Sequence, residues 1–562
     1  MKKRLFLAVI VLSWIPCVFA QQPLSVYPAN WFTGMKRPQL QLMIHATGIG
    51  NFQAALEHAY PGVSLKSVQR VKNKNYLFIN LQIMPEARPE TVDIVLQNGK
   101  SVEKIRYPLY AKKAGNGTRY AAGIRSSDFV YLIMPDRFSN GDPSNDRFAG
   151  LRDTVCNRNN PLARHGGDLQ GVINHLDYIR DLGVTAIWLC PVIENDMPPE
   201  KEPSGSLSGY HGYWFTNHYR IDPRFGGDSA YKRFVAAVHA KGLKVIQDAV
   251  YNHIGEAHWW MSDLPTADWI NQWPQYQNTN HREQAMFDLH GSAKDKEIME
   301  AGWFVPHLPD LNLKNPLLAT FMIQNAIWMT ETYELDGWRV DTYKYCYEPF
   351  LNDLNNALAA EFPSLTSFGE AWVNTVPAAA YFCRNNMNIP FKHNLQGVTD
   401  FPLCFAMLDA IGKKSGWDDG VNRIYATLAL DLLYKNPLYN CIFLDNHDMD
   451  RFYSVAGEDY AGFEIGMGLL LTMRGIPQLY YGTEILMKNF KNPSDAQVRE
   501  DFPGGFPGDP VNKFQSSGRT ELENLAHDYI AKLAGFRKTA PALGNGALMQ
   551  YVPSNGLYVY FR

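Results

Sequence analysis

The sequence has no Cys-X-X-Cys pair, no basic stripe and no apolar run long enough to cross a bilayer. Without clustered cysteines, neither a zinc site nor a dithiol redox motif is supported. The seven cysteines are widely spaced and several lie in apolar runs, so we expect buried free thiols. With 53 basic and 56 acidic residues, the chain lacks the excess of positive charge that is typical of nucleic-acid-binding proteins. Its composition, 46% apolar and 19% charged, is that of a folded, soluble protein.

The first residues have the features of a secretory signal. Basic residues at positions 2–4 precede an apolar run over residues 5–15, and small residues lead up to Ala20. This pattern predicts a signal peptide, residues 1–20, because the run is shorter than the roughly 20 residues of a membrane-spanning helix. Pro16 disfavours the alternative of a lipoprotein anchored through Cys17. We therefore expect a secreted protein with no integral membrane segment.

The pattern of the chain changes near residue 126. Residues 21–125 show short alternating runs separated by Gly, Pro and Asn, typical of an antiparallel β-sandwich. Over residues 126–544, fully apolar runs alternate with amphipathic helical stretches, which predicts a multidomain α/β protein built on a (β/α)8 TIM barrel. An irregular stretch at about 254–313 predicts a subdomain inserted after the third strand. A new β pattern over residues 545–562 predicts the start of a truncated C-terminal β-domain.

Six of the barrel strands are expected from apolar runs at 184–189, 243–249, 335–340, 367–370, 441–444 and 476–480. Acidic or imidazole side chains end four of these runs or follow them: Asp248, His253, Asp341, Glu370, His447 and Asp448. One such residue alone is more often a helix N-cap. Active sites of TIM barrels are built from the carboxyl ends of several strands, so four such endings in order predict a catalytic centre.

The chemistry of glycoside cleavage explains these residue types. Cleavage with retention needs two carboxyl groups about 5–5.5 Å apart, one a nucleophile and one a proton donor. Arg339, on the same strand face as Asp341, is expected to lower the pKa of Asp341 and keep it ionised. Apolar neighbours of Glu370 are expected to raise its pKa for acid catalysis. Asp448 would hold sugar hydroxyls while the ring distorts.

The same motifs resemble those of the α-amylase family of glycoside hydrolases, in order from about residue 128 to 484. The N-terminal β-domain and the segments 131–146, 209–214 and 475–482 are most similar to the cyclomaltodextrinase, neopullulanase and maltogenic amylase group. Two more segments, 30–35 and 498–504, resemble periplasmic starch-utilisation enzymes of Bacteroidetes, which implies a periplasmic location.

The resemblance implies that Asp341 is the nucleophile, Glu370 the proton donor and Asp448 a transition-state stabiliser. It places four further side chains around the sugar at the scissile bond: Tyr213, His253, Arg339 and His447. A packed core tyrosine is the alternative for Tyr213. The resemblance assigns Asp495 and Arg499 to the next sugar, whereas their spacing alone also fits an i,i+4 surface salt bridge.

The resemblance also implies a structural calcium site. Its residues are Asn140, Asp142, Asn145, Asp146, Gly166 and Asp168. Calcium takes six to eight oxygen ligands, which a loop of this composition offers. The alternative is a turn rich in Asp and Asn that needs no metal. Tyr345 stands where the family commonly has histidine, which argues against a second calcium site near Asn252.

The expected activity is retaining hydrolysis of mainly α-1,4 bonds in cyclodextrins, maltooligosaccharides, pullulan or starch, through a covalent glucosyl-Asp intermediate. A transglycosylase or a general α-amylase on the same site remains open, as does a non-catalytic glucan-binding protein. Residues 308–312 depart from the pattern usual in neopullulanases, which leaves the balance of α-1,4 and α-1,6 cleavage open. A homodimer is a further expectation. Trp31, Phe32 and Met35 would lie at its interface or pack within their own chain.

Overall fold

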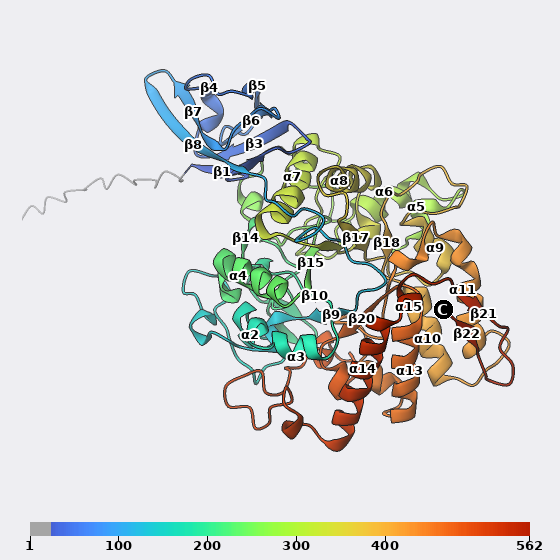
Figure 1. Ribbon diagram of the computed structural model, residues 1–562. Coiled ribbons are helices and arrows are strands. Elements are labelled where there is room, and N and C mark those ends of the chain that lie inside the picture. The colour runs from blue at the N-terminus through green and yellow to red at the C-terminus, as the bar shows by residue number, and fades with distance from the viewer. Residues whose placement is uncertain (1–23) are drawn as a thin grey trace, which may run out of the picture.

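The computed structural model describes residues 24–562, and the predicted signal peptide lies outside the described residues. A small β-domain stands against one side of a larger α/β barrel, next to α7 (Pro316–Tyr333) (Figure 1). Within residues 24–562, no helix combines the length and apolar character needed to cross a membrane.

The N-terminal domain is a sandwich of two four-stranded sheets, with strand orders β1-β3-β6-β5 and β2-β8-β7-β4. Its strands are β1 (Ser25–Tyr27), β2 (Trp31–Thr33), β3 (Gln39–His45), β4 (Gln53–Leu56), β5 (Val63–Arg70), β6 (Tyr76–Ile83), β7 (Glu90–Asn98) and β8 (Ser101–Ala111). In β7, Val92, Ile94 and Leu96 are fully buried while their neighbours are not. Such alternation places one face of the strand in the core between the sheets.

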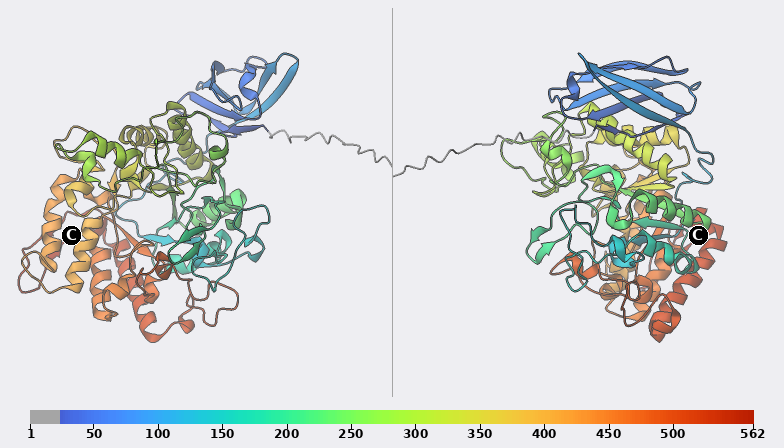
Figure 2. Two further views of the ribbon diagram at one scale, coloured as in Figure 1. Left: turned by 180° about the vertical axis from the view of Figure 1, so that it is seen from behind. Right: turned by 90° about the vertical axis from the view of Figure 1, so that its left-hand side faces the viewer.

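The sandwich stands against its own barrel (Figure 2), and polar contacts join the two. Gln41 and Gln324 of α7 exchange two hydrogen bonds, at 2.8 and 2.7 Å. The backbone N–H groups of Lys36 and Arg37 donate to the buried carboxylate of Glu361. Gln41, Gln324 and Glu361 are buried, and each has a hydrogen-bond partner across the interface, as buried polar groups require.

Trp31, Phe32 and Met35 are buried, with exposed fractions of 2%, 4% and 7%. All three belong to the continuous core of the chain. Of the two alternatives for these residues, packing within their own chain is therefore the one observed. They offer no exposed apolar patch to a partner.

The predicted TIM barrel is confirmed: eight parallel strands run in the order β18-β17-β16-β15-β10-β9-β20-β19. A bridge between Thr399 and Cys441 joins the two ends of this order. The strands are β9 (Val130–Ile133), β10 (Ala186–Leu189), β15 (Lys244–Ala249), β16 (Gly337–Val340), β17 (Thr366–Gly369), β18 (Gly397–Val398), β19 (Cys441–Ile442) and β20 (Ile476–Tyr480). Their residues are buried, as expected where helices cover the outer face.

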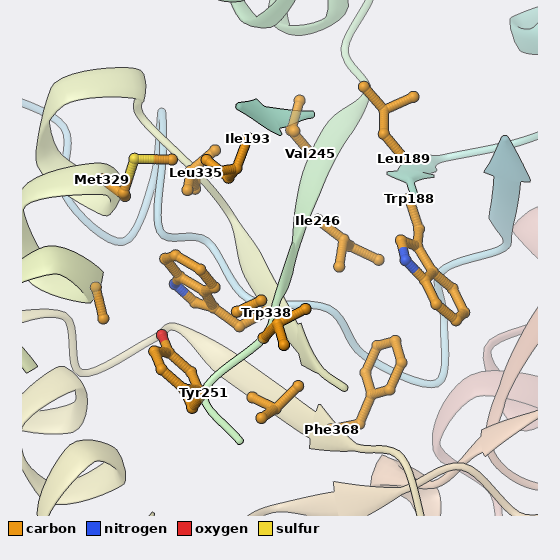
Figure 3. Close-up of a cluster of buried hydrophobic side chains, with 14 of the residues drawn as sticks. Trp188, Leu189, Ile193, Val245, Ile246, Tyr251, Met329, Leu335, Trp338 and Phe368 are labelled. Carbon is orange, nitrogen blue, oxygen red and sulfur yellow. The ribbon is translucent and has the colours of Figure 1, made fainter. Parts of the chain in front are cut away.

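Side chains of these strands fill the barrel and the layer beneath its helices (Figure 3). The rings of Trp188 and Phe368 meet edge to face, with centroids 5.7 Å apart. Trp338 donates instead to Thr330 of α7, on the helix side of its strand. The main covering helices are α4 (Gly227–Ala240), α7, α8 (Glu348–Glu361), α10 (Phe401–Gly412), α11 (Val421–Ala429), α13 (Tyr460–Thr472) and α14 (Glu521–Thr539).

Long excursions leave the carboxyl ends of two strands. The segment after β15 is irregular and holds α5 (Gln284–Phe287) and α6 (Ala293–Ala301), joined by isolated bridges such as that between His253 and Asp310. The segment after β10 forms two small sheets that the sequence pattern did not indicate. They pair β11 (Ile193–Glu194) with β14 (Asn217–Ile221) and β12 (Glu200–Glu202) with β13 (Gly205–Leu207).

The last residues form a two-stranded sheet of β21 (Met549–Gln550) and β22 (Tyr560–Phe561). Gln550 donates to the carbonyl of Tyr425 in α11. Among the described cysteines, Cys190, Cys346, Cys383, Cys404 and Cys441 are buried free thiols, as expected. Cys156 is also free but only partly buried, so the expectation of burial is wrong for that residue.

Candidate active site

A cavity of about 600 Å³ opens at the carboxyl ends of the barrel strands. Most of the predicted catalytic and sugar-binding side chains line it: Tyr213, His253, Asp341, Glu370, Asp448, Asp495 and Arg499. The other two, Arg339 and His447, are 1% exposed and contact these residues directly. The structure therefore brings all nine predicted residues together.

The register of three strands sets this geometry. Asp248 of β15, Arg339 of β16 and Phe368 of β17 are Cα partners, so they lie abreast on the inner face. Asp341 and Glu370 come two residues after Arg339 and Phe368. Because side chains two residues apart on a strand share a face, both carboxyl groups reach the same level above the barrel core.

Arg339 is the centre of the charged groups. Its Nη1 donates to Asp341 Oδ1 at 2.6 Å and to Asp248 Oδ1 at 3.0 Å. Its Nη2 lies 2.9 Å from Glu370 Oε1. The planar guanidinium of arginine holds its N–H donors in fixed directions and can contact three carboxyl groups at once. The ammonium group of lysine has no such fixed arrangement of donors. The three negative charges are thus held around one buried cation.

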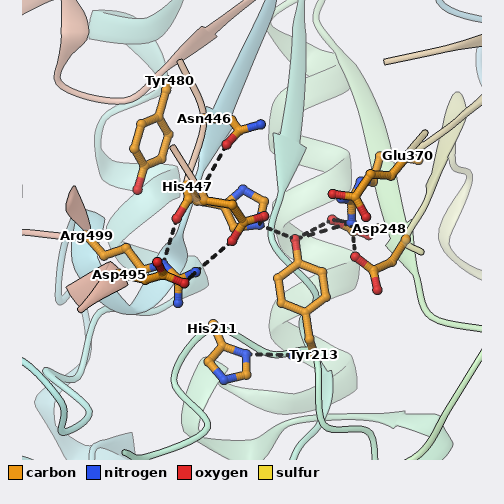
Figure 4. A network of polar contacts seen from close by, with 12 residues as sticks. His211, Tyr213, Asp248, Glu370, Asn446, His447, Tyr480, Asp495 and Arg499 are labelled. Carbon is orange, nitrogen blue, oxygen red and sulfur yellow. Dashed lines mark hydrogen bonds and ion pairs between the residues drawn. The ribbon is translucent and has the colours of Figure 1, made fainter. Parts of the chain in front are cut away.

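Asp248 also anchors a side chain above it (Figure 4). It accepts from Trp188 Nε1 and from the hydroxyl of Tyr213, both at 2.9 Å. His447 Nε2 lies 2.8 Å from that hydroxyl, and its ring stacks on the Tyr213 ring at 5.4 Å. Tyr213 lines the cavity rather than filling the core, so the alternative of a packed core tyrosine is wrong.

The backbone after Asp341 is strained. Thr342 has φ 46°, a left-handed conformation that is uncommon for a β-branched residue. In this conformation its N–H donates to Glu370 Oε2 at 3.0 Å. Strain of this kind persists only where the surroundings impose it, and it concentrates at functional sites. Here it supplies a second fixed partner to Glu370.

The carboxyl groups differ in pKa. Burial raises the pKa of Glu370 to about 7, although Arg339 opposes the shift. Burial also raises the pKa of Asp341 to about 6, with Arg339 lowering it and Asp248 raising it. Arg339 therefore lowers the pKa of Asp341 as predicted, but desolvation is the larger effect, so the pKa of Asp341 lies above its ordinary value. The pKa of Asp341 is thus the lower of the two, so Asp341 can be ionised while Glu370 still holds its proton.

Asp448 is held ionised. Burial alone would raise its pKa, but the positive charges of His447 and Arg499 lower it to about 2. Arg499 is the cation that persists at neutral pH, because burial lowers the pKa of His447 to about 4. Arg499 Nη2 lies 2.7 Å from Asp448 Oδ1 and 3.3 Å from Asp495 Oδ2. Asp495 and Arg499 do form the i,i+4 ion pair of the alternative, with side chains 40% and 7% exposed, and Arg499 also holds Asp448.

Several cavity residues were not among the predicted site residues. Asp248 does not line the cavity but contacts Arg339 and Tyr213, and its position at the end of a predicted strand was the signal that could have marked it. The unpredicted residues that do line the cavity belong to the irregular segments or flank the predicted residues: Glu202, Leu207, His211, Trp214, His281, Phe304, Val305, His307, Leu308, Thr342, Lys344, Tyr345, Trp372 and Lys491. No periodic pattern marks residues of irregular segments, because their place depends on tertiary folding.

The loop of the proposed calcium site lies apart from this cavity. Asp168 caps α2 (Leu169–Asn174), and its two oxygens accept four hydrogen bonds, from Gly141, Asp142, Asn145 and Gly171. Asn140 donates to Asp146 at 2.8 Å, and Gly166 packs against both of them. The side-chain oxygens of Asn140 and Asn145 are buried and have no hydrogen-bond partner among the described residues. Over residues 24–562, no group of three His, Cys, Asp or Glu side chains is placed to hold a metal.

Known proteins share this architecture. The alpha amylase catalytic domain family matches residues 132–504, and the cyclomaltodextrinase N-terminal family matches residues 25–113. The chain is 30% identical over 454 residues to a beta/alpha-amylase of Paenibacillus polymyxa. It is 31% identical over 451 residues to a cyclomaltodextrin glucanotransferase of Geobacillus stearothermophilus. Both matches cover 78% of this chain, which spans 32% and 58% of the length of those two relatives.

Solved structures agree. An alpha-amylase from Anoxybacillus superposes with a TM-score of 0.63 at 28% identity, over 77% of this chain and 84% of that one.

Proposed function

The chain belongs to the alpha-amylase family, and from that premise we propose that it hydrolyses α-glucosidic bonds, mainly α-1,4, with retention of configuration. The substrates we propose are cyclodextrins, maltooligosaccharides, pullulan or starch, in line with the cyclomaltodextrinase N-terminal match. The observation that carries the proposal is the arrangement of Asp341 and Glu370 around Arg339 at the base of the cavity. Retaining cleavage needs such a pair, one member ionised and the other protonated.

In the proposed mechanism Asp341 attacks the anomeric carbon and forms a glucosyl ester. Ion pairing with Arg339 opposes protonation of Asp341, because it stabilises the carboxylate that must attack. Glu370 donates its proton to the departing glycosidic oxygen. As an anion it then deprotonates the water that hydrolyses the ester, and the proton returns to Glu370.

The remaining polar groups act on the sugar. Tyr213 presents a ring fixed by Asp248 and His447, on which the sugar ring can stack. His253 Nε2 is buried without a partner among the described residues, so it is free to bind a hydroxyl at the cavity wall. Asp448 keeps its negative charge near the ring, where positive oxocarbenium character develops.

Product analysis tests the proposal. The protein is incubated separately with β-cyclodextrin, maltoheptaose, pullulan and soluble starch, and reducing ends and cyclic products are followed. New reducing ends without new cyclic glucans support a hydrolase. Cyclic products would favour a transglycosylase, the activity named for the Geobacillus stearothermophilus relative. If none of the glucans is changed, the only alternative left is a non-catalytic glucan-binding protein.

We also propose that the loop at residues 140–146 holds a structural calcium ion. Calcium prefers oxygen ligands, and the unpartnered buried oxygens of Asn140 and Asn145 are of the right kind. Asp146 can add a carboxylate, and Gly166 lies against it. Calcium would hold the loop together, while none of the three proposed catalytic carboxylates belongs to it. We propose secretion to the periplasm, on the basis of the signal pattern in residues 1–20.

A further inference from the structure

A second cavity lies far from the catalytic carboxylates, where the N-terminal sandwich meets the barrel. It measures about 330 Å³ and is bounded by β2, the end of β8, α4 and the end of α7. None of its lining residues belongs to the active-site cavity. Cavities at domain interfaces are common ligand sites when an apolar floor is combined with a few polar groups.

The floor of this interdomain pocket is apolar and rigid. Phe32 of β2 and Tyr333 of α7 are 4% and 3% exposed, and Val235 of α4 is 2% exposed. Tyr333 is held by its hydroxyl, which donates to Asp228 at 3.0 Å. At the rim, the Tyr110 ring of β8 is 53% exposed. A half-exposed ring beside a concave apolar floor offers a flat face for stacking.

Polar groups surround that floor. Lys232 and His239 lie seven residues apart on one face of α4, and Asn30 lies across from them. Lys232 forms no ion pair with any residue of the described chain. His239 Nε2 is bound to Asp336 at 2.9 Å, which leaves Nδ1 as an acceptor. Asn30 uses its oxygen to accept from Trp328, so its amide N–H groups remain to donate.

We propose that this interdomain pocket is a second binding site for α-glucan, which anchors a polymer chain away from the catalytic centre. Sugar rings have apolar C–H faces and hydroxyl edges, which match an exposed tyrosine above a floor rimmed by donors and acceptors. The ligand class rests on the proposed function, because it is the substrate of the same chain. Lys113 of the pocket forms an ion pair with Glu334 and donates to the carbonyl of Thr332. Of the two lysines that line the pocket, Lys232 is therefore the one available to bind sugar hydroxyls.

The test is native affinity electrophoresis through gels that contain amylopectin. All proteins carry Asp341→Asn, so that the polymer is not degraded. We expect Tyr110→Ala to weaken retention about tenfold, because a stacking ring is lost. Tyr551→Ala is the matched control, since Tyr551 is also 53% exposed but lies on the last sheet. Lys232→Ala, on an exposed helix face, should weaken retention in the same direction.

In the Asp341-containing protein, Tyr110→Ala should leave kcat/KM for a short maltooligosaccharide unchanged. Equal retention of the Tyr110→Ala and Tyr551→Ala proteins would overturn the proposal. So would a loss of retention that sedimentation traces to dissociation of a dimer, because the pocket would then bind a second copy of the chain. Absence of any α-glucan hydrolysis by the wild type would instead refute the proposed function, a result separable from these retention measurements.

Discussion

Arg339 Nη2 lies 2.9 Å from Glu370 Oε1, while Nη1 of the same guanidinium donates to Asp341. One buried cation thus contacts both carboxyl groups that the proposed mechanism uses. Removal of a proton from either carboxyl group strengthens its attraction to Arg339 but adds repulsion toward the other. The protonation states of the two groups are therefore linked, and pH dependence is the first place to see it.

We expect kcat/KM to follow a bell-shaped pH profile with its maximum between about 6 and about 7. The rate falls at lower pH because Asp341 becomes protonated and can no longer attack. It falls at higher pH because Glu370 loses the proton that it must donate. Initial rates on maltoheptaose across the acidic and alkaline range measure this profile. A rate that stays high well above neutral pH would contradict the role of Glu370.

Asp341→Asn should lower kcat by roughly four orders of magnitude or more, because no ester intermediate can form. Its melting temperature should not fall. Burial raises the pKa of Asp341 above its unfolded value, so the ionised carboxylate costs folded-state stability as pH rises through about 6. The difference in melting temperature between variant and wild type should therefore grow in favour of the variant over that range. Asp418→Asn, at an exposed position outside the cavity, is the control that should keep its activity.

Asp263 joins the irregular segment after β15 to the N-terminal sandwich. Its carboxylate lies 2.9 Å from His45 Nε2 and accepts hydrogen bonds from Asn73 and Asn75. Asp263→Ala should lower the free energy of unfolding by about 1–3 kcal/mol, because three partly buried side chains lose their hydrogen-bond partner. Chemical denaturation measures the change. Asp268→Ala, an exposed neighbour, should have no such effect, and equal stability of the two variants would disprove the anchoring role.

Chelation should lower the melting temperature of the wild type if the loop at residues 140–146 binds calcium, because a ligand of the folded state alone stabilises it. Asn145→Ala should remove this difference between calcium and chelator, since it deletes one of the unpartnered oxygens. Asn436→Ala, which removes a helix cap elsewhere, should keep it. Identical melting curves of the wild type in calcium and in chelator would mean that the loop is an ordinary turn.

Sequence patterns located the barrel and its strand ends well. The run predicted at 476–480 is β20 itself, that at 243–249 begins one residue before β15, and that at 367–370 is shifted by one residue from β17. Strands buried on both faces are short apolar runs, so their ends are visible in the sequence. Asp341 and Glu370 followed from that rule. The run predicted at 441–444 is longer than β19, because Phe443 and Leu444 are buried without pairing in the sheet.

What the sequence did not predict depends on tertiary contacts. The sheet of β12 and β13 and the cavity wall at Phe304 lie in segments without periodicity. Strand spacing indicated the pairing of Asp341 with Arg339, but it could not indicate that burial raises the pKa of Asp341, because the depth of burial emerges only on folding. The burial of Trp31 against its own chain likewise needed the folded interface.

Trapping of the covalent intermediate tests the central claim most directly. Glu370→Gln cannot protonate a sugar leaving group, but a glycosyl fluoride needs little protonation, so the first step should proceed while hydrolysis stalls. Peptide mass spectrometry of the quenched Glu370→Gln protein, after incubation with α-maltosyl fluoride, locates the added sugar. The account predicts one maltosyl group, attached to Asp341. A sugar on another residue, or a fluoride released with inverted product and no adduct, would contradict it.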